Sequence, residues 1–477
     1  MENMMRNIVS HSNLINVMMR RRIPMKRNIA LFFIVIASSF VAVQPALAQE
    51  QQPSPTLVLI SNVNIFDGKS EKLHQNMHVL VKGNLIEKVS KEPLAIIQTD
   101  NVTMIDGGGR TLMPGLIDAH WHSLLATLSL AELMTNDLAY MSLKGAIANE
   151  GALMRGFTTV RDIGGNVFSI KKATDEGMIN GPRIYPSGAV ISQTSGHGDY
   201  RARLSVPENP GQPLDYLQQA GMGIIADGVP AVIKRSREIL RMGASQLKVM
   251  AGGGVSSDFD PLDVTQYTFA EMSALVEVAN TWNTYIAVHA FTDTAVKQAL
   301  EAGVKSIEHG HLLGEDVIKL MAKKGAWLSM QPILDDEDAI SFPEGSPNRA
   351  KFITVTAGTD KVYGYAKKHG VKIAWGTDTL FDAGLAAKQG KQLAKMKRWF
   401  TPFEVMKMAT HDNAQLLKLS GPRDPYPGEL GVVKAGALAD LILVDGNPLE
   451  NIDLVADPDN KFVLIMKDGK IYKNNIN

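Results

Sequence analysis

Short apolar runs alternate with amphipathic stretches through the middle of this chain. The runs are rich in β-branched residues, as is typical of buried strands. Between them, residues 232–242, 270–279, 295–301 and 315–323 resemble helices. Strands that alternate with helices predict a parallel sheet. The candidate strands are residues 115–120, 158–162, 183–190, 246–250, 285–289, 306–309, 327–331 and 373–377.

Eight strand–helix units are the number that closes a (β/α)8 barrel, which typically takes about 250 residues. Residues 113–419 are long enough for such a barrel with extended loops. Further strand-like runs lie before and after this region. The barrel would interrupt their sheet, so residues 49–112 and 420–477 are expected to pair into one small β-sandwich domain. The predicted fold class is therefore α/β, a (β/α)8 TIM barrel with a β-sandwich formed from both ends of the mature chain.

His120 ends the first candidate strand, and His122 lies two residues further on. Residues at i and i+2 on a strand point to the same face, so both imidazoles can reach one metal ion. Two buried histidines are hard to explain as core residues, because each needs a polar partner. The pair therefore indicates a metal site.

Polar residues also mark the ends of later strands. Lys248 lies in the fourth strand, His289 and His309 end the fifth and sixth, and Asp378 follows the eighth. Functional groups of a barrel gather at the carboxyl ends of its strands, so these side chains are expected to meet the histidine pair. Lys248 has an alternative, a buried stem whose ammonium reaches water. Asp378 has the alternative or additional role of a helix cap.

This ordered set resembles the amidohydrolase superfamily, and within it the imidazolonepropionase-related branch. The motifs are His-x-His on strand one, Lys on strand four, His on strands five and six, and Asp on strand eight. The resemblance implies two divalent metal ions per chain, and Zn²⁺ suits imidazole and carboxylate ligands. The implied ligands are His120, His122 and Asp378 for one ion, His289 and His309 for the other, and carboxylated Lys248 as the bridge.

The resemblance also implies a reaction. Metal-bound water loses its proton near neutral pH, and the resulting hydroxide attacks a carbonyl carbon. Asp378 then takes the hydroxide proton and passes it to the leaving amine.

Substrate choice is expected to depend on the loops at the carboxyl ends of the strands. His197, in a long loop after strand three, either bonds the substrate or lies on the surface. Tyr267 either polarises the scissile carbonyl, binds an anionic end group, or is an exposed residue at a helix start. Arg161 either meets a substrate carboxylate or pairs with Asp162 or Glu308.

Two further features have less weight. The acidic loop around residues 335–338 is interpreted as a solvated rim rather than a third metal site. His311 follows His309 at the spacing of the first histidine pair. Gly310 interrupts that strand, so His311 is not expected to bind a metal ion and would at most support the ligand side chains.

The segment from Gln193 to Asp199 resembles a secreted dipeptidase and carboxypeptidase group of this branch. That group includes Xaa-Pro dipeptidase-like enzymes and an amidohydrolase that cleaves ochratoxin A. The resemblance implies hydrolysis of a dipeptide or N-acyl amino acid with a free carboxylate, and a homo-oligomer. The alternatives are a lactonase, cyclic amidase or phosphotriesterase on the same metals, a mononuclear deaminase or imidazolonepropionase-type enzyme, and a non-catalytic periplasmic binding protein.

The first 48 residues predict a secretory signal peptide. Basic residues near Arg20 to Arg27 precede an apolar run over residues 29–43, and Ala46, Leu47 and Ala48 form a small-residue cleavage site. The run is shorter than the roughly 20 residues that span a bilayer, so no stable membrane anchor is expected after cleavage. Translation that begins at Met25 would shorten the leader. The protein is thus expected in the periplasm or outside the cell.

Composition narrows the functional classes further. The chain has no cysteine, which excludes disulfides, thiolate ligands and a cysteine nucleophile. Without its basic leader the chain has a slight excess of acidic residues and no basic face that would predict nucleic-acid binding.

Overall fold

The computed structural model describes residues 56–97, 101–207 and 211–476. The expected signal peptide, residues 1–48, lies outside this range. Within the described residues, no helix has the length and apolar character needed to cross a membrane.

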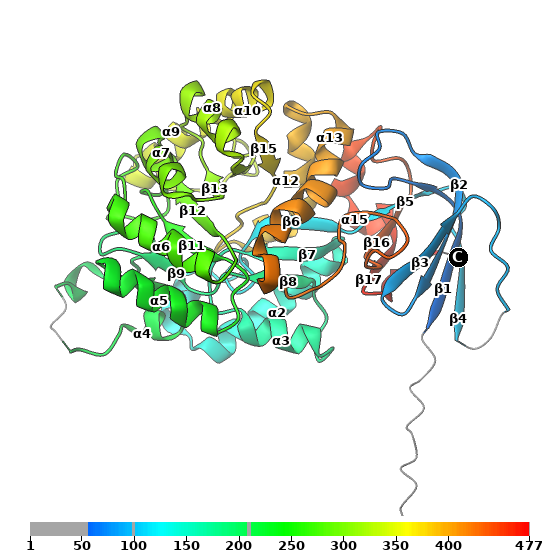
Figure 1. The fold of residues 1–477 in the computed structure, drawn as a ribbon, viewed down its shortest axis with the longest axis horizontal. Coiled ribbons are helices and arrows are strands. Elements are labelled where there is room, and N and C mark those ends of the chain that lie inside the picture. The colour runs from blue at the N-terminus through cyan, green and yellow to red at the C-terminus, as the bar shows by residue number, and fades with distance from the viewer. Residues whose placement is uncertain (1–55, 98–100, 208–210, 477) are drawn as a thin grey trace, which may run out of the picture. The chain divides into compact units, whose positions relative to one another are not determined.

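Parallel strands form the centre of the fold, in two sheets (Figure 1). Every strand pair in these two sheets is parallel, as the alternating pattern predicts. The smaller sheet has the order β6 (Leu116–Trp121), β7 (Phe157–Asp162), β8 (Arg183–Pro186). The larger sheet has the order β10 (Gly223–Ile225), β9 (Val190–Ser192), β11 (Leu247–Met250), β12 (Ile286–Ala290), β13 (Ser306–His309), β14 (Trp327–Ser329), β15 (Lys372–Ala374).

The third predicted strand is the one that differs. Residues 183–190 were expected to form one strand, but they contribute to β8 and β9 in different sheets. Gly188, between them, has a φ of +70°, a left-handed conformation that a continuous strand does not contain. The expected long loop after this strand also contains β10, which pairs with β9.

Isolated backbone hydrogen bonds, rather than strand ladders, join the two sheets. The amide of Ala119 donates to the carbonyl of Trp375 at 3.1 Å, next to β15. On the other side, the amide of Ser245, just before β11, donates to the carbonyl of Pro186 at the end of β8 at 2.7 Å. The structure therefore confirms an α/β fold built on parallel strands. The strands form two parallel sheets, and a single closed eight-stranded sheet is not observed among the described residues.

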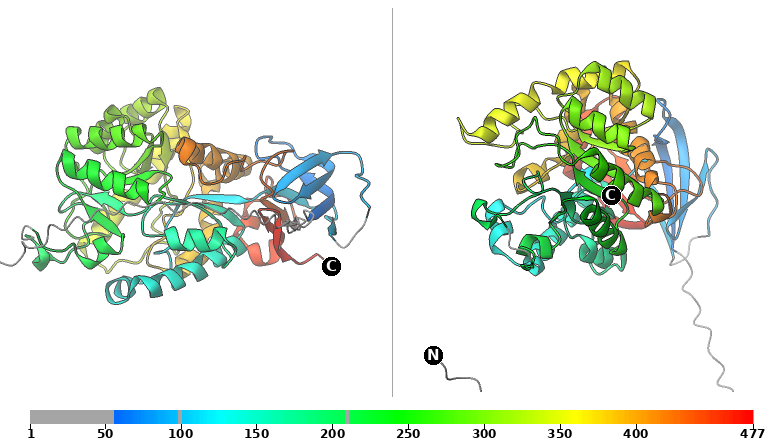
Figure 2. Two further views of the ribbon diagram at one scale, coloured as in Figure 1. Left: turned by 60° about the horizontal axis from the view of Figure 1, so that its bottom comes forward. Right: turned by 60° about the vertical axis from the view of Figure 1, so that its left-hand side comes forward.

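Helices follow most of the parallel strands and cover them on the outside (Figures 1 and 2). Helix α6 begins with a capping box, in which Thr268 and Glu271 bond each other's backbone amides. Successive helices α5, α6, α7 and α8 contact one another along the outer layer. The helices are α1 (Leu130–Thr135), α2 (Leu138–Met154), α3 (Phe168–Asp175), α4 (Tyr216–Gln219), α5 (Val229–Arg241), α6 (Phe269–Thr281), α7 (Asp293–Ala302), α8 (Glu315–Lys324), α9 (Pro347–Thr356), α10 (Thr359–Lys368), α11 (Ala383–Ala387), α12 (Gln389–Ala394), α13 (Pro402–Lys407), α14 (Asn413–Leu417) and α15 (Pro458–Lys461).

Strands from both ends of the chain pair in a third sheet of eight strands. Strand β16 runs antiparallel to β5, with Leu443 opposite Leu112. The strand order of this sheet is β18 (Lys470–Asn474), β17 (Phe462–Lys467), β16 (Leu441–Val444), β5 (Thr111–Pro114), β1 (Leu57–Ile65), β2 (His74–Lys82), β3 (Leu85–Ser90). The remaining strand, β4 (Val102–Asp106), pairs with β1. A separate apolar cluster that includes Val58, Val79 and Leu464 stabilises this sheet.

Candidate active site

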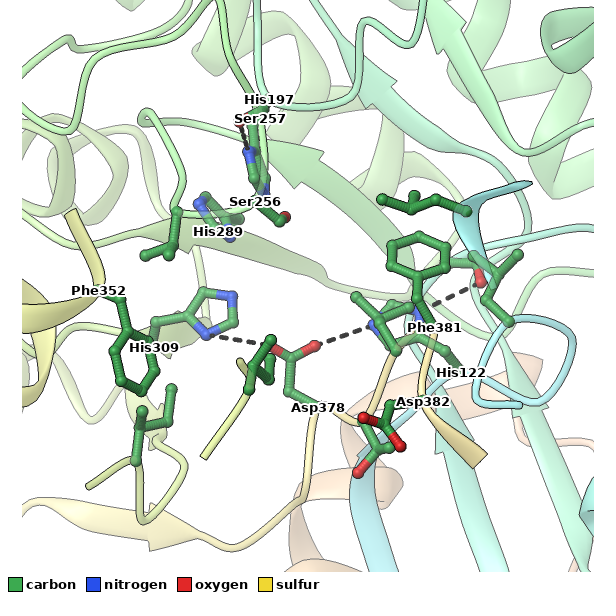
Figure 3. A pocket seen from close by; sticks show the side chains of 18 of the residues that line it. His122, His197, Ser256, Ser257, His289, His309, Phe352, Asp378, Phe381 and Asp382 are labelled. Atoms are coloured by element: carbon green, nitrogen blue, oxygen red, sulfur yellow. Dashed lines mark hydrogen bonds and ion pairs between the residues drawn. The ribbon is translucent and has the colours of Figure 1, made fainter. Parts of the chain in front are cut away.

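All six predicted metal ligands lie around one cavity of about 700 Å³. They come from the carboxyl ends of β6, β11, β12 and β13 and from the segment after β15. Figure 3 shows several of them around Asp378. The residues brought together are His120, His122, Lys248, His289, His309 and Asp378.

Asp378 lies at the centre of this group. One carboxylate oxygen, Oδ1, is 3.1 Å from Nε2 of both His120 and His122, and Oδ2 is 3.7 Å from Nδ1 of His309. Burial alone would raise the pKa of Asp378, but the surrounding imidazoles outweigh it and hold that pKa well below its usual range. Asp378 is therefore a carboxylate, the form that binds a cation.

Two of the histidines have a side-chain acceptor at Nδ1. His120 Nδ1 lies 2.8 Å from Oε2 of Glu308, and His309 Nδ1 lies 2.8 Å from Oε1 of Gln331. Each acceptor places the ring proton on Nδ1 and leaves the lone pair on Nε2.

The other two histidines are oriented by backbone carbonyls. His122 Nδ1 is 3.3 Å from the carbonyl oxygen of Gly164. His289 is turned the other way, with Nε2 3.1 Å from the carbonyl oxygen of Gly253. His122 thus offers Nε2 to a metal, and His289 offers Nδ1.

The electrostatics of the four rings fit a cation site. Burial, the largest cause, holds the pKa of His122, His289 and His309 below the usual range, so these rings are neutral and able to ligate. His120 differs, because Asp378 and Glu308 outweigh burial and raise its pKa. Its Nε2 is buried and, apart from the 3.1 Å ion-pair contact with Oδ1 of Asp378, has no partner within the described residues. A metal ion would satisfy this nitrogen, so the residues present fit the group that the resemblance implies.

Arg161 lies behind the site rather than in it. Its buried guanidinium donates to both carboxylate oxygens of Glu308, at 2.9 and 2.8 Å. The positive charge of Arg161 overcomes the effect of burial and holds the pKa of Glu308 well below its usual range. Contact of Arg161 with a substrate carboxylate is not supported, because Arg161 does not line the cavity. The alternative, pairing with Glu308, is what the structure shows.

Lys248 is buried, with 2 % of its surface exposed. Within the described residues its ammonium makes no hydrogen bond or ion pair, and the side chain lines the cavity, so an ammonium in contact with cavity water and a carbamate both remain compatible with this position. Burial lowers the pKa of Lys248 to about 8 against the opposing charges of Glu308 and Asp378. The neutral amine, which is the form that adds to carbon dioxide, is therefore more populated than in an exposed lysine.

His197 lies in the cavity wall beside the ligand group. Its Nδ1 is 2.9 Å from Oδ2 of Asp260 and 2.7 Å from Oγ of Ser257, and its ring stacks on His289 with centroids 4.1 Å apart. Gly254 makes room for this ring, because a Cβ there would lie 1.8 Å from Cε1 of His197. The surface alternative for His197 is therefore not supported.

Tyr267 is not brought into the cavity. It stands just before α6, as expected for a helix start, but its side chain is buried and does not line the cavity. Its φ is +64°, and its backbone bonds the side chains of Gln193 and Gln298. The expected contact with a substrate carbonyl or end group is therefore not supported. The pattern of strand and helix positions does not predict this left-handed backbone conformation of Tyr267.

The acidic loop after β14 is paired with cations. Asp336 lies 2.8 Å from the ammonium of Lys395, and Asp338 lies 2.6 Å from that of Lys388. These ion pairs agree with a rim rather than a third metal site. His311 is buried beside His309 and does not line the cavity.

Sequence reasoning missed the residues that orient the ligands. Glu308 was considered only as a partner of Arg161, and Gln331 and Asp260 were not singled out. A signal was present for Glu308, because a charged residue inside an apolar strand needs a buried partner. Asp260 has no such signal, since it lies in a polar loop.

The fold and this site define a hydrolase of the amidohydrolase class. The family model described as the amidohydrolase family matches residues 111–473, and the chain belongs to that family. This family is generally metal-dependent, and the His120, His309 and Asp378 cluster agrees with that property.

Among particular relatives, ochratoxinase of Aspergillus niger is 35% identical over 372 residues, which cover 76% of this chain and 75% of that protein. A crystal structure of a prolidase complexed with N-methylphosphonate-L-proline has a TM-score of 0.79 and 33% identity, and covers 88% of this chain and 100% of that chain. A Xaa-Pro dipeptidase with bound methionine has a TM-score of 0.75 and 27% identity, with the same coverage. The protein is therefore a hydrolase that acts on carbon–nitrogen bonds, which excludes a non-catalytic binding protein.

Proposed function

We propose that the protein is a binuclear metal-dependent amidohydrolase of the dipeptidase or carboxypeptidase type. It cleaves the amide bond of a dipeptide or N-acyl amino acid with a free carboxylate, and ochratoxin A is one candidate substrate. The observation that carries this proposal is the convergence of four oriented imidazoles, a buried lysine and a carboxylate on one cavity. The relatives that act on prolyl peptides or on ochratoxin support the substrate class.

The ligand set divides between two ions. His120, His122 and Asp378 would hold one ion, His289 and His309 the other, and the carbamate of Lys248 would bridge them. Imidazole and carboxylate donors favour Zn²⁺. Such ions, when bound, supply a water molecule of lowered pKa and polarise the scissile carbonyl.

The chain's own residues would then move protons and orient the substrate. The carboxylate of Asp378 accepts a proton from the attacking water and delivers it to the leaving nitrogen. His197, held through Nδ1 by Asp260, has Nε2 left to bond the substrate. Arg161 and Glu308 keep His120 in the tautomer that ligates through Nε2.

Several wider features belong to the same proposal. We infer that the two parallel sheets form one closed (β/α)8 barrel, and that the eight-stranded sheet folds into a β-sandwich. We also infer export to the periplasm or medium after removal of residues 1–48, assembly as a homo-oligomer, and no binding to nucleic acid.

Metal content measured by elemental mass spectrometry tests the proposal. Wild type and Lys248→Ala are purified without chelator, and wild type is expected to hold about two ions per chain, falling sharply in the variant. One ion, unchanged by the substitution, would instead indicate a mononuclear enzyme of the deaminase or imidazolonepropionase type.

A substrate panel then separates the remaining alternatives. N-acyl amino acids and dipeptides are compared with lactones, cyclic amides and phosphotriesters on the same zinc-loaded enzyme. Release of free amino acid is the expected result. Turnover of the esters with no amide cleavage would contradict the peptidase assignment while leaving the metal site intact.

A further inference from the structure

Four large apolar side chains at the cavity are exposed to solvent. Leu130, Met134, Phe259 and Ile340 are 55%, 60%, 41% and 39% exposed, and all four line the same cavity as the ligands. We call these four residues the mouth ring. A contiguous exposed apolar surface commonly marks a binding site.

Local structure fixes two members of the mouth ring on helix α1. Leu130 and Met134 are four residues apart and so share one face of that helix. A capping box between Ser129 and Glu132 starts the helix, and Leu133 on another face is buried. The two exposed side chains are therefore presented by an anchored element.

The other two members lie on loops that are tied to the rest of the fold. The carbonyl of Phe259 accepts a hydrogen bond from Oγ of Ser195 at 2.9 Å. Ile340 lies two residues after Asp338, which is paired with Lys388, the residue between α11 and α12. The mouth ring thus combines side chains from three separate segments that line one cavity.

Apolar side chains also line the cavity next to the ligand group. Figure 3 shows Phe352 beside His309 and Phe381 beside His122. Leu133 and other aliphatic residues add to the same lining. At about 700 Å³ the cavity is in the range that holds a drug-sized ligand rather than a small acyl group alone.

Three carboxylates of the lining already have partners within the protein. Asp199 is paired with Arg201, Asp338 with Lys388, and Asp260 with His197. Two other carboxylates, Asp258 and Asp382, are exposed to water. The cavity therefore offers an apolar chain many contacts, whereas outside the ligand group the carboxylates that the described lining leaves for a charged amine are the two solvated ones, Asp258 and Asp382.

We infer that the preferred substrates are N-acyl amino acids whose acyl group is a long apolar chain that reaches the mouth ring. This inference rests on the proposed function and names its substrate class. Such a chain would be desolvated along its length, whereas the free amine of a dipeptide would lose water and gain only solvated carboxylates, whose ion pairs contribute little.

The test is a series of N-acyl-L-phenylalanines with acetyl, hexanoyl and decanoyl groups, below their micelle-forming concentrations. Zinc-loaded wild-type enzyme is expected to show a kcat/KM at least about tenfold higher for decanoyl than for acetyl, since a fully buried methylene contributes roughly fourfold. Release of phenylalanine is measured for each member.

Variants of the mouth ring test whether these side chains cause the dependence of kcat/KM on acyl-chain length. Met134→Ser and Phe259→Ser are each expected to lower the decanoyl-to-acetyl ratio by roughly threefold or more, with little change for the acetyl substrate. Leu143→Ser is the matched control, because Leu143 is 70% exposed on α2 but does not line the cavity. The ratio is expected to stay unchanged in that control.

The outcomes are distinct. A flat response to chain length, or an equal loss in Leu143→Ser, would overturn the inference while acetyl turnover preserves the proposed function. A mouth-ring variant that changes the mass in solution but not the chain-length response would also overturn it, in favour of a subunit contact. No phenylalanine from any member would instead refute the proposed function itself.

Discussion

Glu308 shows how much of this site depends on a residue that does not touch the cavity. Its carboxylate lies between Arg161 and His120, and it controls which nitrogen of His120 carries the proton. Outer partners of this kind commonly affect metal affinity by about 10- to 100-fold.

We therefore expect Glu308→Gln to weaken zinc binding by about 10- to 100-fold, measured by competition with a chelator. The amide also leaves the guanidinium of Arg161 buried without a counter-charge, which costs roughly 3–5 kcal/mol of folding free energy.

The double variant Arg161→Met with Glu308→Gln separates the two effects. It removes both buried charges, so thermal stability is expected to recover while zinc affinity stays low. Recovery of both would show that Glu308 acts through stability alone.

The ligand residues were predictable from the sequence, but the tautomers and their partners were not. His-x-His, Lys248, His289, His309 and Asp378 each end or follow an apolar run, which is a local signal. Glu308 and His309 are adjacent in the sequence, yet both side chains take part in the buried site. Regular strand alternation would place them on opposite faces of the sheet. The φ of +75° at His309 permits this, and no local pattern predicts that backbone conformation.

At the scale of elements, helix α1 depends on one exposed carboxylate. Glu132 completes the capping box with Ser129 and bonds the ammonium of Lys144. The bond to Lys144, followed by those to Ser129, lowers the pKa of Glu132 from 4.5 to about 2. The contribution of Glu132 to stability is therefore fully present above pH 4.5 and is lost as the pH falls towards 2.

We expect the difference in unfolding temperature between wild type and Glu132→Gln to follow that window. The wild type should be more stable above pH 4.5, and the two should converge near pH 2, as measured by calorimetry. Glu277→Gln, an exposed position on α6, is the control. A difference that persists unchanged at pH 2 would show that the charge of Glu132 is not responsible.

The strands were predicted more fully than their pairing. All eight expected runs contain a strand, because their apolar composition is a local property. The split of the third run at Gly188, and the short β10, depend on which sheet each segment joins. A local sequence pattern of a few residues does not predict such long-range strand pairing.

For the whole molecule, bound metal is expected to contribute to folding. The ligands come from strands spread over residues 120–378, so ions that bind only the folded chain stabilise it by mass action. At 1,000-fold excess over Kd this amounts to about 4 kcal/mol.

We expect chelation to lower the unfolding temperature of wild type, and added Zn²⁺ to restore it. The fall should be smaller in Lys248→Ala, which begins with less metal. An unfolding temperature that is insensitive to chelator in a protein shown to hold metal would contradict this coupling.

Asp118 links the beginning of this fold to its end. Its Oδ1 accepts hydrogen bonds from the amides of His120, at 3.0 Å, and Thr377, at 3.1 Å. A nascent chain made only as far as β13 already has its four ligand histidines, yet it lacks both Thr377 and Asp378. Contacts between residues so far apart in sequence are costly to form early. Metal uptake would then require the part of the chain that carries Thr377 and Asp378, so a chain that ends after β13 is expected to stay unloaded although it has all four ligand histidines.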